Sequence, residues 1–352
     1  MAPDFLNDTK YSPQVIQEFS ELSPDRPWIF IACFNRLNFF KIALQSLLNQ
    51  TESDFYLIVT DNSTTDEIED WLFSTKFSRP IFYVHWRPTL EMPYGHIYQL
   101  LELLMKHRPE YWQIFHDDDI AYPEIVATLL RTLKSDPELI AVAPNAFEFS
   151  GKSVGALMRR DVSDKIFSEP RQILYQYFAP SRGIACCPSY MYTKKTQEIF
   201  NQKLRGGKYI DIWLNTSFAK WGKIKWLGQP LLLYRRHPGQ DSAVHSVLCK
   251  FSIYNCFVKS GDVTKTELLY DWFFLQNIKQ YTKRKSLLRW STFSQIHSRL
   301  LWLATRHALR AALRPAFWGL MISKVTANSI LKFRLSAQVR QDAEDLLKRS
   351  VD

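Results

Sequence analysis

Short apolar runs alternate with amphipathic segments over roughly the first 145 residues of the chain. A continuous apolar run of strand length marks a strand that is covered on both faces, whereas apolar residues recurring every three or four positions mark a helix. Five strands are predicted at residues 28–34, 55–60, 81–85, 111–116 and 139–143, and four helices at residues 38–49, 65–74, 95–106 and 123–133. This alternation predicts an α/β domain with an open, mostly parallel sheet of the nucleotide-binding, Rossmann-like type, flanked by helices.

The pattern differs outside these residues. The polar, proline-containing N-terminus predicts a lead-in with one short helix near residues 13–19. Regular signals weaken over residues 147–209 and resume with a helix at 210–221 and apolar runs at 223–227 and 230–234. We therefore expect a lead-in at residues 1–26, one domain at 27–245 with halves at 27–145 and 146–245, and a mainly helical, basic extension at 246–352.

The positive charge is concentrated in this extension. The 352 residues carry a net charge of +10, yet Lys and Arg balance Asp and Glu up to Lys250. Residues 272–341 hold 13 basic residues and no acidic one. A content of 46% hydrophobic residues argues against disorder over most of the length.

Cysteine usage and the N-terminus predict a cytosolic protein. The five cysteines are odd in number and none forms a C-x-x-C pair, so neither a zinc ribbon nor a disulfide scaffold is indicated. The first ten residues are polar where a signal peptide would be basic and then apolar, and no run of 18 apolar residues occurs.

Acidic residues follow two of the predicted strands. Asp117, Asp118 and Asp119 come directly after the strand at 111–116, and Asp61 follows the strand at 55–60. Ligands of open α/β sheets bind at the carboxyl ends of the strands. Three adjacent carboxylates need a cation, and Mg2+ or Mn2+ carrying the phosphates of a nucleotide is the usual solution. The alternatives are a solvated turn for the three acids and a helix cap for Asp61.

Four ordered pieces of sequence resemble family 2 glycosyltransferases of the GT-A fold. They are WIFIACFNR with SLLNQT behind it, LIVTDNSTTD at 57–66, IFHDDDIAYPE at 114–124, and DIWLNTSFAKWGKIKWLGQPLLLYRRHPGQDS at 211–242. Each piece alone is a weak signal, but their order and their positions at strand ends make the resemblance specific.

The resemblance implies a binding site for a nucleotide-sugar donor. Its residues would be Ala32, Phe34, Asn35, Arg36, Asp61, Asp117, Asp118, Arg235 and Arg236. In the family's pattern Asp61 recognises the base, usually at the N3-H of uracil, and the arginines close over the diphosphate. The metal, Mn2+ or Mg2+, would be held by Asp119 with Asp117 and His237. His116 is left out of the metal shell because such a histidine more often packs or hydrogen-bonds.

The acceptor side departs from the family's pattern. Many members carry Glu-Asp just before a D-L-W-L helix, and that Asp is the general base. Here the corresponding place reads Gly207-Lys208-Tyr209-Ile210, so Asp211 is the nearby carboxylate able to act as base. The alternative for Asp211 is the N-cap of the helix that follows. Cys186 and Cys187 are expected to be small buried residues in a loop facing the acceptor.

The basic extension predicts a membrane-surface helix. Arg299, Arg306, Arg310 and Arg314 recur at helical spacing, and apolar surface comes from Ile296, Leu300, Leu303, Leu309 and Leu313. Such a helix suits an anionic membrane surface, and no nucleic-acid module is recognisable. Pro315 would break the helix, and residues 316–322 are too few to span a bilayer.

These observations predict an inverting, metal-dependent glycosyltransferase at the inner face of the membrane. It would move a sugar, most simply from a UDP-sugar, to a hydroxyl of a glycan or lipid-linked acceptor, as in bacterial surface polysaccharide, lipopolysaccharide or capsule biosynthesis. The alternatives are a catalytically silent nucleotide-binding or scaffold protein of the same fold, and a nucleotidyltransferase. The latter usually needs a glycine-rich phosphate loop, and Phe34-Asn35-Arg36-Leu37 contains no glycine.

Overall fold

The structure is a computed structural model. It describes residues 12–15, 19–86, 93–178, 184–201, 209–240, 247–264, 268–275, 302, 305–319, 321–322 and 337–351. The predicted boundary at residue 245 and the predicted surface residues Arg299, Ile296, Leu300 and Leu303 lie outside these ranges.

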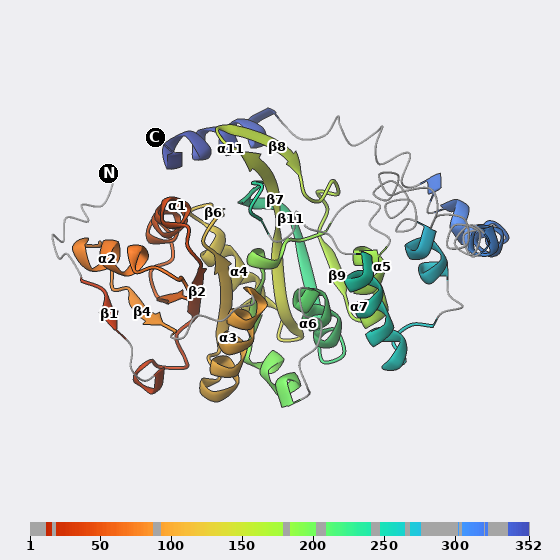
Figure 1. Ribbon diagram of the computed structural model, residues 1–352, viewed down its shortest axis with the longest axis horizontal. Coiled ribbons are helices and arrows are strands. Elements are labelled where there is room, and N and C mark those ends of the chain that lie inside the picture. Colours follow the sequence, from red (N-terminus) through yellow and green to blue (C-terminus); the bar gives the residue numbers. More distant parts are fainter. Residues whose placement is uncertain are drawn as a thin grey trace, which may run out of the picture.

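A single mixed sheet runs through the molecule (Figure 1). Its strand order is β1-β4-β3-β2-β5-β10-β7-β11-β6, and β8 and β9 pair alongside with β7 and β11. The strands are β1 (Gln14–Val15), β2 (Trp28–Cys33), β3 (Tyr56–Asp61), β4 (Phe82–His85), β5 (Tyr111–His116), β6 (Ile120–Ala121), β7 (Leu139–Ser150), β8 (Ser153–Leu157), β9 (Lys165–Phe167), β10 (Met191–Thr193) and β11 (Lys223–Arg235). The pairs β4-β3, β3-β2, β2-β5 and β7-β11 are parallel, which confirms the predicted mostly parallel sheet.

Helices cover both faces of the sheet, because alternate residues of the strands point to opposite sides. In β2, Ile29 and Ile31 join one buried cluster whereas Trp28 and Phe30 join the other. The first cluster includes residues of α1 (Leu37–Leu48), α2 (Glu67–Ser74), α4 (Ile125–Ser135) and α11 (Ala337–Val351). The second includes residues of α3 (Pro93–His107), α5 (Pro170–Phe178), α6 (Ile210–Phe218) and α7 (Val247–Lys259).

The structure corrects several predicted elements. The helix expected near residues 13–19 is wrong, because Gln14 and Val15 form strand β1, whose hydrogen-bonded partner is β4. The apolar runs at 223–227 and 230–234 are one strand, β11, with register shifts on either side of Pro230. Short 3-10 helices occupy Phe19–Glu21, Cys187–Ser189 and Lys194–Asn201.

The end of the chain returns to the domain. In Figure 1, α11 lies across the top of the molecule beside β8. Leu346 and Leu347 join the first buried cluster, and Arg340 donates to the carbonyl oxygen of Val154 at 2.9 Å. Among the described residues, no helix is both long and apolar enough to cross a membrane.

Gly228 allows the chain before β9 to cross close to β11. A Cβ at this position would lie 1.6 Å from the carbonyl oxygen of Val162, and the backbone N–H of Gly228 donates to Asp164 at 2.8 Å. A side chain here would force two backbone segments apart.

We expect Gly228→Ala to lower the free energy of unfolding by about 3 kcal/mol, because overpacking against a fixed backbone cannot be relieved by a rotamer change. Urea unfolding measures this effect. Gly319→Ala is the matched control, since a Cβ there would meet no atom within 4 Å and the helical site should gain about 1 kcal/mol. Equal stability of the two variants would contradict the close approach of Gly228 to the backbone of Val162.

Candidate functional site

The three consecutive aspartates form a buried turn between β5 and β6. Asp117 and Asp119 are fully buried and Asp118 is nearly so. The alternative of a solvated turn is therefore wrong. A buried carboxylate must be compensated by donors or cations, so the partners of each acid indicate its role.

Asp117 is compensated by the loop that follows β2. Its Oδ2 accepts from the Phe34 backbone N–H at 3.0 Å and from Arg36 Nε at 3.3 Å, and its Oδ1 accepts from the terminal nitrogen of Arg36 at 2.5 Å. Burial raises the pKa of Asp117 to about 7, although the Arg36 guanidinium opposes the shift. Both oxygens are thus engaged with the protein, which leaves Asp117 less suited to a metal than its neighbours.

Asp118 and Asp119 each keep one oxygen without a hydrogen-bond partner among the described residues. These atoms are Asp118 Oδ1 and Asp119 Oδ2, and both are buried. The other oxygen of Asp119 accepts from the backbone N–H of Arg235 at 2.8 Å. Burial, followed by the charge of Asp118, raises the pKa of Asp119. Two inward-facing carboxylate oxygens lacking donors are the arrangement that a divalent cation satisfies.

His116 completes this group. Ligand atoms of His116, Asp118 and Asp119 all lie within 4.8 Å of one another. The sequence interpretation excluded His116 from the metal shell. Its place as the last residue of β5, directly before the three aspartates, was the signal that could have included it. His237, which the sequence predicted as a ligand, instead places Nε2 2.9 Å from the other oxygen of Asp118.

The two arginines after β11 are placed differently. Arg235 is buried, and its guanidinium lies 4.3 Å from the ring centroid of Phe39 and 4.4 Å from that of Phe149. Its Nε donates to the carbonyl oxygen of Asp118 at 2.6 Å, so this side chain fixes the acid turn. Arg236 is partly exposed and pairs with Glu148 at 2.5 Å.

Asp61 lies at the end of β3 and is completely buried. Its Oδ1 accepts from the backbone N–H of Ser63 at 2.9 Å, and its Oδ2 accepts from the Tyr83 hydroxyl at 3.1 Å. The helix-cap alternative for Asp61 is wrong, because the N-cap of α2 is Asp66. The bond from Ser63 instead stabilises the turn that follows β3. Asn35, with a positive φ of 54°, ties the neighbouring loop to this turn by donating from its backbone N–H to Ser63 Oγ at 2.8 Å.

Ala32 and Phe34, which were also predicted to bind the nucleotide-sugar donor, lie at or just after the carboxyl end of β2. Ala32 pairs in register with Thr60 on one side and with His116 on the other. Phe34 is an exposed aromatic residue at the end of β2. A second group of possible cation ligands, Asp66, Glu69 and His85, is found near the end of β4, where His85 Nδ1 lies 2.8 Å from Glu69.

Asp211 stands in the first turn of α6, and the N-cap of that helix is Tyr209. The N-cap alternative for Asp211 is therefore wrong. Burial raises the pKa of Asp211 to about 6, and the backbone N–H of Ile212 opposes the shift. The residue is nevertheless partly exposed. A carboxylate of this kind is ionised at neutral pH and holds a proton more readily than a surface acid does.

The charge of Asp211 acts on the Cys187 thiol. Negative charge at Asp211 and at Asp119 both add to the burial that raises the pKa of the Cys187 thiol, which places Cys187 within electrostatic reach of the two acids. Asn215 fixes the first turn of α6 by donating to the carbonyl oxygen of Asp211 at 2.9 Å and accepting from the Tyr192 hydroxyl at 3.2 Å. Cys187 begins the short 3-10 helix Cys187–Ser189, and Cys186 is the extended residue directly before it.

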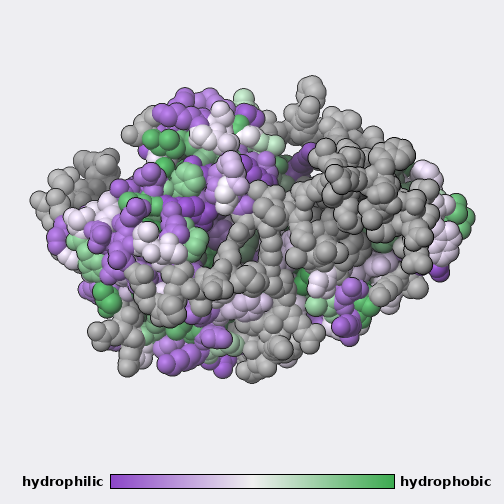
Figure 2. Space-filling view, in the orientation of Figure 1, coloured by the Kyte–Doolittle hydropathy of each residue, from purple (hydrophilic) through white to green (hydrophobic). Residues whose placement is uncertain are grey.

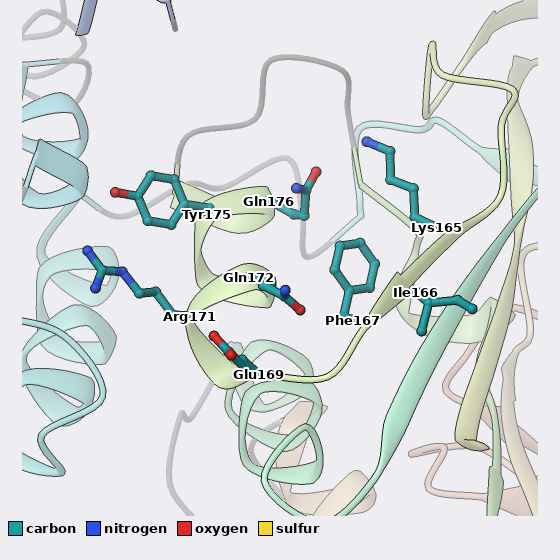
Figure 3. A pocket seen from close by; sticks show the side chains of 8 residues that line it. All are labelled: Lys165, Ile166, Phe167, Glu169, Arg171, Gln172, Tyr175 and Gln176. Atoms are coloured by element: carbon teal, nitrogen blue, oxygen red, sulfur yellow. The ribbon is translucent and has the colours of Figure 1, made fainter. Parts of the chain in front are cut away.

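A hollow of about 510 Å³ lies elsewhere, between β9 and α5. Figure 3 shows Gln172, Gln176 and Phe167 facing this space, whereas Arg171 and Tyr175 point to the other side of α5. None of the acids described above lines it. We therefore place the candidate site at the acid turn and not in this hollow.

Solved structures of S. aureus TarS resemble this chain. One TarS structure superposes with a TM-score of 0.54 at 10% identity, covering 93% of this chain and 55% of that chain. TarS 1–349 in complex with UDP gives 0.53 at 12% identity, covering 90% and 92%, and the complex with UDP-GlcNAc gives 0.50 at 10% identity, covering 86% and 91%. The chain thus spans about half the length of the first of these proteins. At such low identities the likeness shows the fold.

The family assignment comes from the sequence model of a known family. No curated protein matches the chain. Residues 28–202, about half of the chain, match the family model described as Glycosyl transferase family 2. The match runs from β2 through the acid turn to the end of the 3-10 helix at Lys194–Asn201. The chain belongs to glycosyl transferase family 2, and its sheet has the GT-A fold.

Proposed function

We propose that this chain transfers a sugar, with inversion, from a nucleotide-diphosphate donor to an acceptor hydroxyl, and that the donor is a UDP-sugar. The observation that carries the proposal is a pair of buried oxygens on Asp118 and Asp119 that have no donor within the described part of the chain, in a group with His116 at the carboxyl edge of a family 2 sheet. UDP and UDP-GlcNAc in the TarS complexes support the choice of nucleotide by analogy of fold.

The proposed metal, Mn2+ or Mg2+, would be held by His116, Asp118 and Asp119. When bound, such an ion neutralises charge on the departing diphosphate. The predicted set of Asp117, Asp119 and His237 is revised in this proposal. Asp117 holds Arg36 at the end of β2, and His237 orients Asp118 through its Nε2 contact. Outer partners of this kind commonly tune ligand orientation.

The donor would lie across the ends of β2, β3 and β5. Phe34 offers an exposed ring for the base, and the fixed turn of Asp61 and Asn35 shapes the floor of its site. Arg236 is the more accessible arginine for the diphosphate, because Arg235 is held between two rings. An arginine at this place stabilises the charge that develops on the leaving group.

Asp211 would act as the general base. Its raised pKa and partial exposure suit a carboxylate that accepts the proton of an acceptor hydroxyl while that hydroxyl attacks the sugar. The acceptor is proposed to be a glycan or a lipid-linked sugar of bacterial surface polysaccharide, which rests on the family resemblance. The site would then work at the cytoplasmic face of the membrane.

The first test is titration of UDP in the presence and absence of Mn2+. We expect wild-type protein to bind UDP more tightly with the metal, and we expect Asp119→Ala and His116→Ala each to reduce that gain at least about tenfold, because each removes a ligand. His85→Ala, from the second group of possible ligands, is the matched control and should keep the gain. If the Asp119 variant still binds UDP more tightly with the metal, the acid turn is not the metal site.

The second test is hydrolysis of a panel of nucleotide sugars, with water as the acceptor. We expect Asp211→Asn to lower turnover by a factor of about 10² to 10⁴ without weakening UDP binding, since the base acts only in the chemical step. The wild-type rate should fall as the pH drops through about 6, where the Asp211 carboxylate takes up its proton.

Glu138→Gln, an exposed acid-to-amide change paired with Lys223, is the matched control and should leave turnover unchanged. An Asp211→Asn variant as fast as wild type would refute the base assignment. Tight UDP binding without hydrolysis of any donor would favour the catalytically silent alternative.

A further inference from the structure

A buried carboxylate anchors part of the basic extension to the domain. Asp271 is fully buried, and its oxygens accept from Arg310 Nε at 2.9 and 3.0 Å. His307 Nδ1 lies 2.6 Å from the same carboxylate. Ala311, one turn after His307, is also buried. The helical residues 305–312 therefore have one face fixed against the chain around Asp271.

This anchoring corrects the predicted basic face. Arg310 turns toward Asp271, and a guanidinium nitrogen of Arg314 lies 4.0 Å from the same carboxylate. Two of the four arginines expected to face a membrane are thus paired with an acid that stands just before the acid-free segment. Arg310 and Arg314 thus turn inward, against the prediction, whereas Arg306 is exposed.

The opposite face carries exposed apolar side chains. Trp302, Leu309 and Leu313 are 61%, 63% and 84% exposed, and the Arg306 guanidinium lies 5.6 Å from the ring centroid of Trp302. Positions 302, 306, 309 and 313 follow the helical spacing of one stripe. We call these four residues the exposed stripe. Trp318 and Ile322 extend the exposed apolar surface beyond Pro315.

The figures place this segment at the periphery of the molecule. Figure 1 draws the helices between residues 302 and 322 at the right-hand edge, far from β1 at the other end of the sheet. Figure 2 shows hydrophobic green beside paler and purple residues at that same edge. The exposed stripe is therefore remote from the donor-binding strands β2 and β3.

We propose that the exposed stripe docks on the surface of an anionic lipid bilayer, with its apolar side chains inserted among the headgroups. Large apolar residues accompanied by arginine and tryptophan are what an interfacial helix presents to lipid. The sequence from 272 to 341 holds 13 basic residues and no acidic one, a net positive charge that attracts anionic headgroups and repels a second copy of this chain. Charge complementarity thus favours lipid over self-association.

Docking would not require transfer activity, so the two proposals fail independently. The exposed stripe lies outside the residues that hold the donor or the base. A sugar transferase docked in this way would meet lipid-linked acceptors at the surface where they are confined.

The test is co-sedimentation of the full chain with vesicles of phosphatidylcholine alone and of phosphatidylcholine mixed with phosphatidylglycerol. We expect binding to the mixed vesicles, weaker binding at high salt, and at least about a tenfold loss of partitioning for Leu309→Glu/Leu313→Glu. Val162→Glu/Ile166→Glu, two exposed apolar positions in and before β9, is the matched control and should bind as wild type does.

Circular dichroism melts establish that both variants fold, and sedimentation velocity follows self-association. Equal partitioning of the stripe variant and wild type would overturn the proposal, as would binding that ignores lipid charge. Wild-type oligomers that dissociate in the stripe variant, together with no vesicle binding, would identify a second copy of the chain as the occupant and would also overturn it.

Discussion

The structure depends on compensating three buried carboxylates at the end of a strand. Burying even one ionised carboxylate costs several kcal/mol unless donors or cations replace the lost water. Arg36, from the loop after β2, engages Asp117, and Arg235, at the end of β11, supports Asp118 and Asp119 through its side chain and its backbone N–H. The compensation is incomplete, because two oxygens have no donor among the described residues. A divalent ion at these oxygens would supply the missing compensation.

Sequence patterns predicted the framework because its strands are uninterrupted apolar runs. Trp28–Cys33 and Tyr56–Asp61 fall where expected, since strands covered on both faces cannot tolerate polar interruption. β10 has three residues and gave no periodic signal, and β7 continues through polar Asn145 and Glu148, which hid its length. The sequence patterns could not predict which side chains pair with one another. Arg36 and Asp117 are 81 positions apart, and helical spacing could not tell which side of Arg310 faced the interior.

The candidate site combines acids that hydrogen bonds hold in place with a partly exposed carboxylate, Asp211. Hydrogen bonds from backbone and arginine donors hold Asp61, Asp117 and Asp119, so these acids keep one geometry. Asp211 instead lies in the first turn of α6. Asn215 donates to its carbonyl oxygen and accepts a hydrogen bond from the Tyr192 hydroxyl. In the proposed function, a rigid donor side with Asp211 as the base is compatible with one acceptor hydroxyl being exchanged for another by changes in the surrounding loops.

The antiparallel insertion of β10 between β5 and β7 has a consequence for how the domain assembles. Strands β2 to β5 can pair as soon as they are made, but β5 gains its other neighbour only when Met191–Thr193 arrives, after β7 has already emerged. The backbone donor to Asp119 comes from Arg235, still later in the chain. Closing such long loops is slow, because their entropy is lost before the contacts form. The acid turn therefore gains its donor from Arg235 only once β11 has been made, and a nascent chain that ends before β11 lacks that hydrogen bond.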